Sequence, residues 1–441
     1  MDTFERYSMR DQKPRSASSQ NKTHSTETRE THMPAIRLRL GAFSAAIALL
    51  AVTSSGALAQ KKYDTGATDT EIKIGNIMPY SGPASAYGVI GKTEQAYFNK
   101  VNAEGGINGR KINFVSYDDG YSPPKTVEQA RKLVESDEVL LIFNSLGTPP
   151  NTAIQKYMNS KKVPQLFVAT GATKWNDPKE FPWTMGWQPN YQSESRIYAK
   201  YILKEKPDAK IAVLYQNDDY GKDYLKGLKD GLGAKAASMI IIEESFEVTQ
   251  PTIDSNIVKL KSLNADVFFN VTTPKFAAQA IKKMAEIEWK PLHFLNNVSV
   301  SIGSVIKPAG MENAQGIISS AYLKDPTDPQ WKDDAGMKAW NEFLDKYFPE
   351  ANRTDASVIY GYTVAQTVVH VLKQCGDDLT RENVMRQAAN IRGLELGGLL
   401  PGVKVDTSPT DFAPLSQLQL MRFKGETWER FGDVISADVG G

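Results

Sequence analysis

The stretch EIKIGNIMPYSGPASAYGVI, residues 71–90, decides the fold of this chain. Apolar Ile72 and Ile74 alternate with polar residues, and this period of two predicts a strand that enters a buried sheet. The segment 79–83 then ends the strand because it is rich in turn-forming residues. After Gly88 the apolar residues recur at intervals of three and four, which indicates a helix. The order is therefore strand, polar loop and helix.

The loop of this first unit is a candidate ligand site. Ser81, Ser85 and Tyr87 supply hydroxyl groups beside the start of the helix. In open α/β sheets the loops at the carboxyl ends of the strands hold the ligand. Unpaired backbone N–H groups at a helix N-terminus favour an anion. The pattern predicts that this loop contacts a small anion or polar solute.

Strand and helix alternate along the rest of the chain in two sets. In the first set we expect strands at 111–117, 139–143 and 163–169. We expect one helix at 125–135 and a second that follows the loop 144–148 and ends at about residue 160. In the second we expect strands at 210–215, 239–243, 266–270 and 292–295, with helices at 191–205, 221–233, 252–262 and 274–286. Such alternation predicts an α/β protein with parallel sheets and right-handed crossovers.

The remaining segments connect or complete these two sets. Residues 175–194 carry three tryptophans and three prolines and predict an irregular passage between two lobes. Residues 315–322 predict a second crossing. After it we expect helices at 334–347, 355–373 and 380–390, and two short strands near 404 and at 417–423.

Composition excludes several classes of partner. The chain has 441 residues and a formal net charge of +1, so no electrostatic field favours nucleic acid. Its length predicts two or three domains. Cys375 is the single cysteine, so no intrachain disulfide can form, and we expect it to be a small buried apolar side chain.

A secretory signal peptide is predicted at residues 33–59. Arg37 and Arg39 precede an apolar run over 40–52, and Ala57–Ala59 forms a small-x-small cleavage site. We expect cleavage after Ala59 and export to the periplasm. Residues 1–32 are polar and aperiodic, and our hypothesis is that they are a mis-called extension. No later segment has the length and apolarity of a membrane-spanning helix, so we expect a soluble mature protein.

Catalytic and cofactor motifs are absent from the sequence. The Gly91-Lys92-Thr93 tripeptide resembles the end of a phosphate-binding loop, but Ala86 stands where that motif needs glycine. There is no HExxH, CxxC or GxSxG pattern and no zinc-ligand spacing. We therefore predict no catalytic residue, no cofactor and no metal, although a site built from carboxylates alone remains open.

Two further strand ends carry small hydroxyl residues. The loop 144–148 offers Ser145 and Thr148, and the loop 170–173 offers Gly171 and Thr173. Two helix N-termini that meet one pocket would favour a carboxylate, each by about 0.3–1 kcal/mol. The alternative is that these residues are ordinary helix caps, which use the same residue types.

Three segments carry a family resemblance: IKIGNIMPYSGPASAYG at 72–88, VNAEGGINGRKINFVSYDDGYSPPKTVEQARKLV at 101–134, and IAVLYQNDDYGKDYLKGLKDGL at 211–232. Together they resemble the leucine/isoleucine/valine-binding proteins of bacterial ABC transporters, over roughly residues 70–430. The resemblance implies a type I periplasmic binding fold. That fold has two α/β lobes, each a mostly parallel sheet flanked by helices, joined by three crossing strands, with a ligand closed between them.

From this resemblance we expect lobe 1 to comprise residues 69–183 and 321–395, and lobe 2 to comprise 184–320 and 396–435. It implies an exported, monomeric protein that delivers a small molecule to a membrane permease. A sensor of the same fold and an exported hydrolase are the rival functions. The ligand site implied by the resemblance consists of Tyr87, Ser145, Leu146, Gly147, Thr148, Gly171, Thr173, Tyr220, Thr272 and Asn297.

One part of the family's site is not kept. The family pairs the ligand ammonium with an acidic residue in the second lobe, but the matching segment 295–299 reads LNNVS, and we expect no carboxylate within its reach. A second-lobe aromatic residue of the family falls at Thr272. Burying an unpaired ammonium costs several kcal/mol. Two ligand classes stay open: a branched-chain or related amino acid, and an aromatic or aliphatic carboxylate or amide without the α-amino group.

Overall fold

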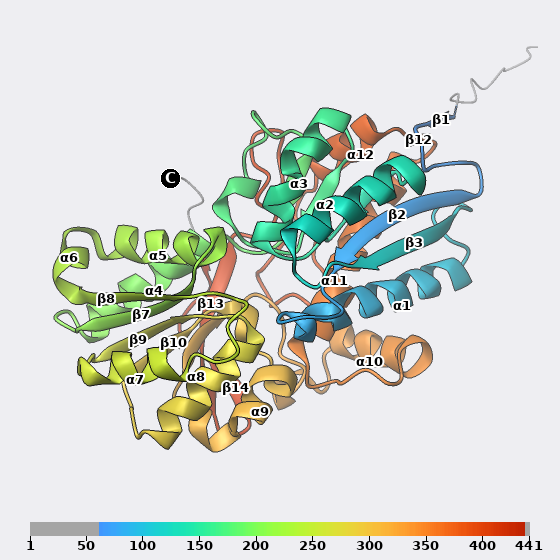
Figure 1. Cartoon of the computed structure of the whole chain (residues 1–441). Coiled ribbons are helices and arrows are strands. Elements are labelled where there is room, and N and C mark those ends of the chain that lie inside the picture. Colours follow the sequence, from blue (N-terminus) through green and yellow to red (C-terminus); the bar gives the residue numbers. More distant parts are fainter. Residues whose placement is uncertain (1–60, 437–441) are drawn as a thin grey trace, which may run out of the picture. The chain divides into compact units, whose positions relative to one another are not determined.

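The computed structural model describes residues 61–436, which build two sheets flanked by helices (Figure 1). The first sheet has the order β3-β2-β4-β5-β6, and all neighbouring strands are parallel. Its strands are β2 (Glu71–Met78), β3 (Lys111–Asp118), β4 (Leu141–Phe143), β5 (Gln165–Val168) and β6 (Thr184–Gly186). The strand and helix predicted from residues 71–90 are therefore confirmed, and the helix is α1 (Val89–Ala103).

Helices cover both faces of the first sheet because its strands are apolar on both sides. Ile74 of β2 packs in one core cluster with Phe98 of α1, whereas Ile77 packs in another with Ala130 of α2 and Ile154 of α3. Figure 1 shows α1 and α2 on opposite sides of β2. The helices of this half are α1, α2 (Pro123–Arg131), α3 (Thr148–Lys161), α10 (Ala335–Tyr347), α11 (Ala356–Cys375) and α12 (Arg381–Ala388).

The second sheet has the order β14-β13-β11-β10-β9-β7-β8. Five of its strands are parallel: β7 (Ile211–Gln216), β8 (Ile240–Phe246), β9 (Val267–Val271), β10 (Leu292–Leu295) and β11 (Ile318–Ala321). The last part of the chain adds β13 (Gln417–Lys424), β14 (Thr427–Arg430) and β15 (Ile435–Ser436) in antiparallel pairs. A separate two-stranded ladder joins β1 (Lys62–Tyr63) to β12 (Asp378–Leu379).

Alternation along β7 also divides the second core. Val213 belongs to the cluster that α4 and α5 share, and Leu214 packs with Phe268 and Phe276 on the side of α7 and α8. The helices of this half are α4 (Tyr191–Glu205), α5 (Asp219–Leu232), α6 (Ala236–Met239), α7 (Asp254–Ser262), α8 (Pro274–Glu286) and α9 (Lys307–Ala309). The α/β fold class with two mostly parallel sheets is thus confirmed.

The chain passes between the two sheets three times. It leaves the first sheet after β6, returns to that half after β11 to form α10 to α12, and re-enters the second sheet at β13. The expected lobe boundary at residue 183 falls just before β6, which pairs with β5 of the first sheet. The exact domain limits remain a prediction.

Two details of the expected secondary structure are wrong. The segment near Lys404 is no strand, since a single bridge joins Leu394 and Val405 and residues 401–402 before it form a turn. The passage 175–194 is not irregular throughout. It contains β6, and α4 begins at Tyr191, so the connection shrinks to residues 187–190.

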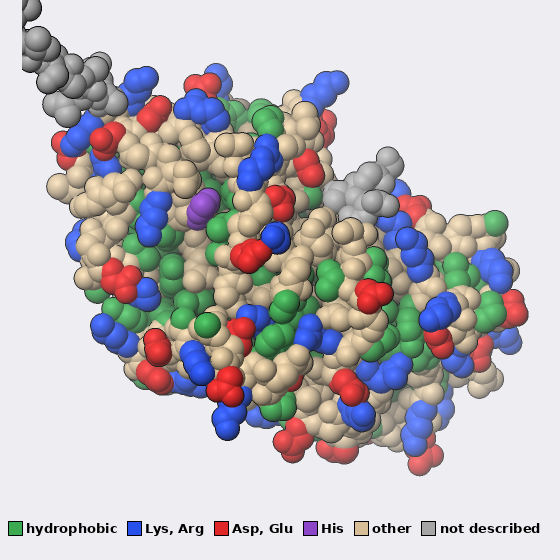
Figure 2. Space-filling view, turned by 180° about the vertical axis from the view of Figure 1, so that it is seen from behind, with side chains coloured by type: hydrophobic (Ala, Val, Ile, Leu, Met, Phe, Trp, Pro, Cys, Tyr) green, Lys and Arg blue, Asp and Glu red, His purple; other side chains and the backbone are tan. Residues whose placement is uncertain are grey.

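None of the helices within residues 61–436 is long and apolar enough to cross a membrane. Figure 2 shows Lys, Arg, Asp and Glu side chains interspersed over the face that it presents. The expected signal peptide at 33–59, its cleavage after Ala59 and the extension at 1–32 lie outside the described residues.

Candidate functional site

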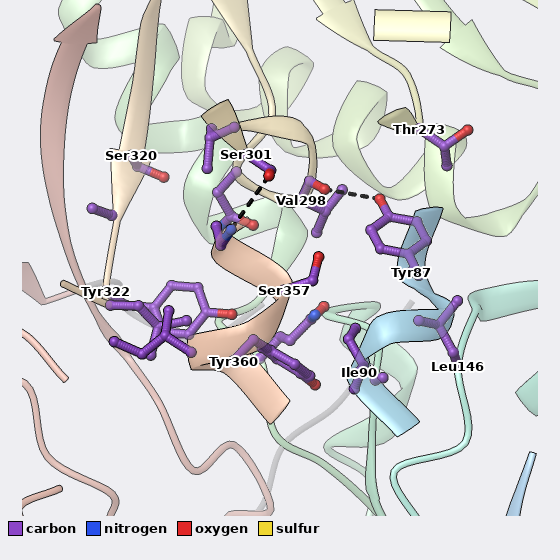
Figure 3. A pocket seen from close by; sticks show the side chains of 18 of the residues that line it. Tyr87, Ile90, Leu146, Thr273, Val298, Ser301, Ser320, Tyr322, Ser357 and Tyr360 are labelled. Atoms are coloured by element: carbon purple, nitrogen blue, oxygen red, sulfur yellow. Dashed lines mark hydrogen bonds between the residues drawn. The ribbon is translucent and has the colours of Figure 1, made fainter. Parts of the chain in front are cut away.

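A cavity lies between the two halves and is lined by residues from both (Figure 3). Its volume is about 110 Å³, counted as the space open to the centres of water molecules. This is several times the roughly 10–15 Å³ that a cavity needs to hold one water, so the cavity has room for a small solute.

Seven aromatic side chains contribute to the cavity wall. They are Tyr87, Tyr121, Tyr191, Tyr220, Tyr322, Tyr360 and Trp428. Burial raises the pKa of the Tyr87, Tyr121 and Tyr220 hydroxyls well above its ordinary value, so they stay neutral hydrogen-bonding groups. Such a wall suits an apolar or aromatic solute body with a small number of polar groups.

Hydrogen bonds join the two halves across the cavity. Tyr87 donates its hydroxyl to the Val298 carbonyl at 2.8 Å, as the dashed line in Figure 3 shows. Ser301, three residues after Val298, donates to the Asp355 carboxylate at 2.9 Å. Both bonds connect a segment that follows β10 with a segment of the first half, so opening the cavity requires breaking them.

Six of the ten expected site residues line the cavity: Tyr87, Leu146, Gly147, Thr148, Tyr220 and Asn297. The other four, Ser145, Gly171, Thr173 and Thr272, do not. Their assignment as ligand contacts remains a prediction from the resemblance. Two of the four are buried behind the wall, and the other two make hydrogen bonds with other segments of the protein.

The loop 170–173 makes hydrogen bonds to other parts of the protein rather than to the cavity. Thr173 donates both its backbone N–H and its hydroxyl to the Asp223 carboxylate of α5, at 2.8 and 2.9 Å. The Gly171 carbonyl accepts from the Tyr191 N–H at 2.8 Å. Tyr191 thereby contributes to the wall, whereas Gly171 and Thr173 lie outside it.

Ser145 and Thr272 are buried at 0 % exposure behind the wall. The Ser145 carbonyl accepts from the Asn151 side chain at 2.7 Å. The Thr272 hydroxyl donates to Asn270 at 2.7 Å, and the next residue, Thr273, takes the place in the lining.

The N-terminus of α3 offers little to a carboxylate. Pro149 and Pro150 have no N–H group, and the N–H groups of Leu146 and Gly147 already donate to the Ile77 and Ala169 carbonyls. The Thr148 hydroxyl lies 2.5 Å from the Thr170 hydroxyl. Among the backbone groups of this loop, at most the Thr148 N–H remains for a ligand. The Ser145 hydroxyl has no partner among residues 61–436, but Ser145 is buried outside the lining.

The expectation of no carboxylate within reach of Asn297 is wrong. Glu194 of α4 accepts the Asn297 N–H at 2.8 Å and the Tyr224 hydroxyl at 2.6 Å, and it also accepts the Tyr198 hydroxyl. Its side chain is completely buried but is not part of the cavity lining. The segment 295–299 gave no sign of it because Glu194 lies 103 residues before Asn297. Burial raises the pKa of the Glu194 carboxyl to about 7.

Two charged residues of the described chain, Lys324 and Asp325, line the cavity at the end near Trp428. The Lys324 ammonium is paired with Asp334 at 2.8 Å. Asp325 accepts from the Thr327 N–H at 2.8 Å, and burial raises the pKa of its carboxyl. Within residues 61–436 no group of three His, Cys, Asp or Glu side chains could hold a metal ion.

Sequence reasoning missed most of the aromatic wall. Tyr121 follows the end of β3, so the strand-end rule could have found it, and it packs so closely that a Cβ on Gly147 would lie 2.4 Å from its ring. Tyr322 and Tyr360 come from the late crossing and from α11, and no local pattern marks them. Trp187 lies behind this wall, with its ring against both Tyr322 and Tyr360.

Comparison with known proteins establishes the family. Residues 71–427 match the family model described as periplasmic binding protein, so the chain belongs to this family. Among curated relatives, it is similar to Leu/Ile/Val-binding protein homolog 1 of Brucella abortus (strain 2308). The two are 26 % identical over 324 residues, which cover 72 % of this chain and 82 % of that protein.

Solved structures share the fold. A branched-chain amino acid ABC transporter protein from Thermus thermophilus with bound valine has a TM-score of 0.76 at 16 % identity, covering 85 % of this chain and 98 % of that one. A fatty acid ABC transporter substrate-binding protein from Thermomonospora curvata has a TM-score of 0.72 at 22 % identity, covering 86 % and 96 %. The type I periplasmic binding fold is thereby confirmed.

Proposed function

We propose that this protein is the exported solute-binding component of an ABC importer, which encloses a small molecule between its two halves and delivers it to a membrane permease. The observation that carries this proposal is the cavity between the halves, bridged by the bond from Tyr87 to Val298. Membership of the periplasmic binding protein family and the transporter names of its relatives support it.

Two ligand classes are candidates for the cavity. The relatives named for leucine, isoleucine and valine support a branched-chain or related amino acid. The state of the two nearby acidic side chains supports the second class, a small carboxylate or amide without an α-amino group. Glu194 is covered and already accepts three hydrogen bonds, and burial raises the pKa of the Asp325 carboxyl in the lining, which favours its neutral form. An ammonium would have to displace these donors, and a buried ammonium without a partner is costly.

We propose binding without chemical change to the ligand. No residue is given a catalytic role, and His293 is buried against Asn270 with its pKa lowered to about 3, which removes it as an acid near neutral pH. Export through residues 33–59 and a monomeric state belong to the same proposal.

A thermal-shift screen tests the proposal. The protein beginning at Gln60 would be heated separately with leucine, valine, hexanoate, benzoate, hexanamide and benzamide. A ligand at 100 times its dissociation constant adds about 2.7 kcal/mol of stability, which raises the melting temperature measurably. Stabilisation by acids or amides alone would identify the second class, stabilisation by leucine or valine the first. The absence of any shift would contradict both.

A further inference from the structure

Three buried polar atoms on residues of the cavity wall have no hydrogen-bond partner among residues 61–436. They are the Tyr220 hydroxyl, the Nδ2 atom of Asn297 and the Oδ2 atom of Asp325. A buried polar group without a partner is unfavourable, so a bond with the ligand would stabilise each of them. The two donors are on Tyr220, which is 3 % exposed, and Asn297, which is 8 % exposed.

Both residues belong to the half that carries the second sheet, and both are held in place. The Asn297 N–H donates to Glu194 at 2.8 Å, which fixes the turn after β10. The Tyr220 ring packs edge-on against Tyr191 and Tyr224, at 5.5 and 5.6 Å between ring centres. Tyr87 also donates to the carbonyl of the next residue, Val298, so it meets the same turn.

The polar atoms on this wall are complementary to an acceptor. An amide NH2 can only donate, and a tyrosine hydroxyl can donate to an anion or to a carbonyl. On the opposite wall, the loop before α3 offers at most one backbone donor, at Thr148, because Pro149 and Pro150 begin the helix. Among residues 61–436, the buried lining donors without a partner are the Tyr220 hydroxyl and the Asn297 NH2 group, both on the wall formed by the second half.

We propose that the ligand binds with a carboxylate or amide carbonyl directed at Tyr220 and Asn297, and with its apolar body toward Tyr322 and Tyr360. This orientation rests on the proposed function and makes it more specific. Figure 3 shows Tyr322 and Tyr360 on the side of the cavity away from Tyr87 and Leu146, where a body without polar groups meets aromatic rings.

The same arrangement disfavours an ammonium group. The Asn297 NH2 group would face it donor to donor. The Glu194 oxygens beneath this turn already accept bonds from Asn297, Tyr198 and Tyr224. Asp325, the acidic residue in the lining, has an Oδ2 atom without a partner among residues 61–436, but burial raises the pKa of its carboxyl and so favours the neutral form over one that would pair with an ammonium.

Four probes with one six-carbon chain separate the head groups: hexanoate, hexanamide, hexylamine and norleucine. Isothermal titration calorimetry would measure their dissociation constants with the parent protein. We expect hexanoate and hexanamide to bind, and norleucine and hexylamine to bind more weakly. Tighter binding of hexylamine or norleucine than of hexanoate would overturn the proposed orientation.

Two variants test the residues. Tyr220→Phe removes one oxygen and keeps the ring, and we expect about 10- to 100-fold weaker hexanoate binding, as for a lost bond to a charged group. Asn297→Asp places a carboxylate in the wall. It should weaken hexanoate more than hexanamide, a difference that a merely structural defect would not produce.

Tyr157→Phe is the matched control. Tyr157 lies on α3 outside the cavity, and its hydroxyl donates to Glu135 at the protein surface. It should bind hexanoate as the parent does. If the parent binds hexanoate and Tyr220→Phe and Asn297→Asp bind it equally well, the orientation is wrong while the proposed function stands. If no probe binds the parent, both the ligand class and the orientation are wrong.

Discussion

Replacing Glu194 by glutamine should change how the stability of this protein depends on pH. The Glu194 carboxyl is completely buried, and burial raises its pKa from 4.5 to about 7. Below pH 4.5 the carboxyl is protonated in the folded and the unfolded chain. Between pH 4.5 and 7 the unfolded chain loses this proton while the folded chain keeps it, so the free energy of unfolding falls as the pH rises.

The size of the effect follows from the two pKa values. Their difference of about 2.5, at about 1.4 kcal/mol for each pH unit, gives about 3 kcal/mol of stability lost between pH 4.5 and pH 8. Glutamine does not titrate, so Glu194→Gln should lack this loss. Asp218, whose pKa is raised to about 6, changes stability in the same direction but equally in both proteins.

Urea unfolding followed by far-UV circular dichroism, at intervals from pH 4.5 to 8.5, measures the difference between parent and variant. Because other titrating groups cancel in this difference, it reports on Glu194 alone. Glu350→Gln makes the same chemical change at an exposed site and should leave the parent's pH dependence intact. If the difference in the free energy of unfolding between parent and variant stays constant across this pH range, the raised pKa of Glu194 is refuted.

Three further predictions concern single sites. Tyr87→Phe removes the donor to the Val298 carbonyl. Calorimetry with hexanoate or leucine, whichever the protein binds, should show about tenfold weaker binding, as for one lost buried hydrogen bond. Unchanged affinity would mean that this bond does not stabilise the closed cavity. Gly227→Ala would place a Cβ 2.4 Å from the Gln192 Cα where α4 and α5 meet, and urea unfolding should show a loss of about 1–3 kcal/mol; equal stability would contradict that packing. Cys375 is 5 % exposed and its thiol pKa is raised to about 12, so an aromatic disulfide reagent should label it slowly until urea unfolds the chain, and rapid labelling of the native protein would count against its burial.

The elements of the fold could be predicted because their signals are local. Ile72 and Ile74 alternate as a strand requires, and the apolar spacing after Gly88 is helical, so β2 and α1 were expected almost at their observed bounds. The resemblance added the two-lobed arrangement. The segment near Lys404 failed because a short apolar alternation does not reveal whether a partner strand lies beside it.

The candidate site was only partly predictable, because a local pattern does not show which distant residues contact each other. Strand ends mark where a ligand can lie, and Thr148 was found in this way, whereas Leu146 and Gly147 came from the resemblance. Whether a side chain at such an end faces the cavity depends on its other partners. Thr173 has its hydrogen bonds with Asp223, and no sequence pattern announces a contact across 50 residues.

The sequence by itself determined the order of strands and helices, the apolar faces and the strand-end loops, since each depends on residues a few positions apart. The tertiary structure alone decided the wall of the cavity. It brought Glu194 beneath Asn297, set Tyr322 and Tyr360 opposite Tyr87, and left the Tyr220 hydroxyl without a hydrogen-bond partner in the part of the chain that the structure describes. Those relations join residues that are distant along the chain, and the packing of the two halves against each other creates them.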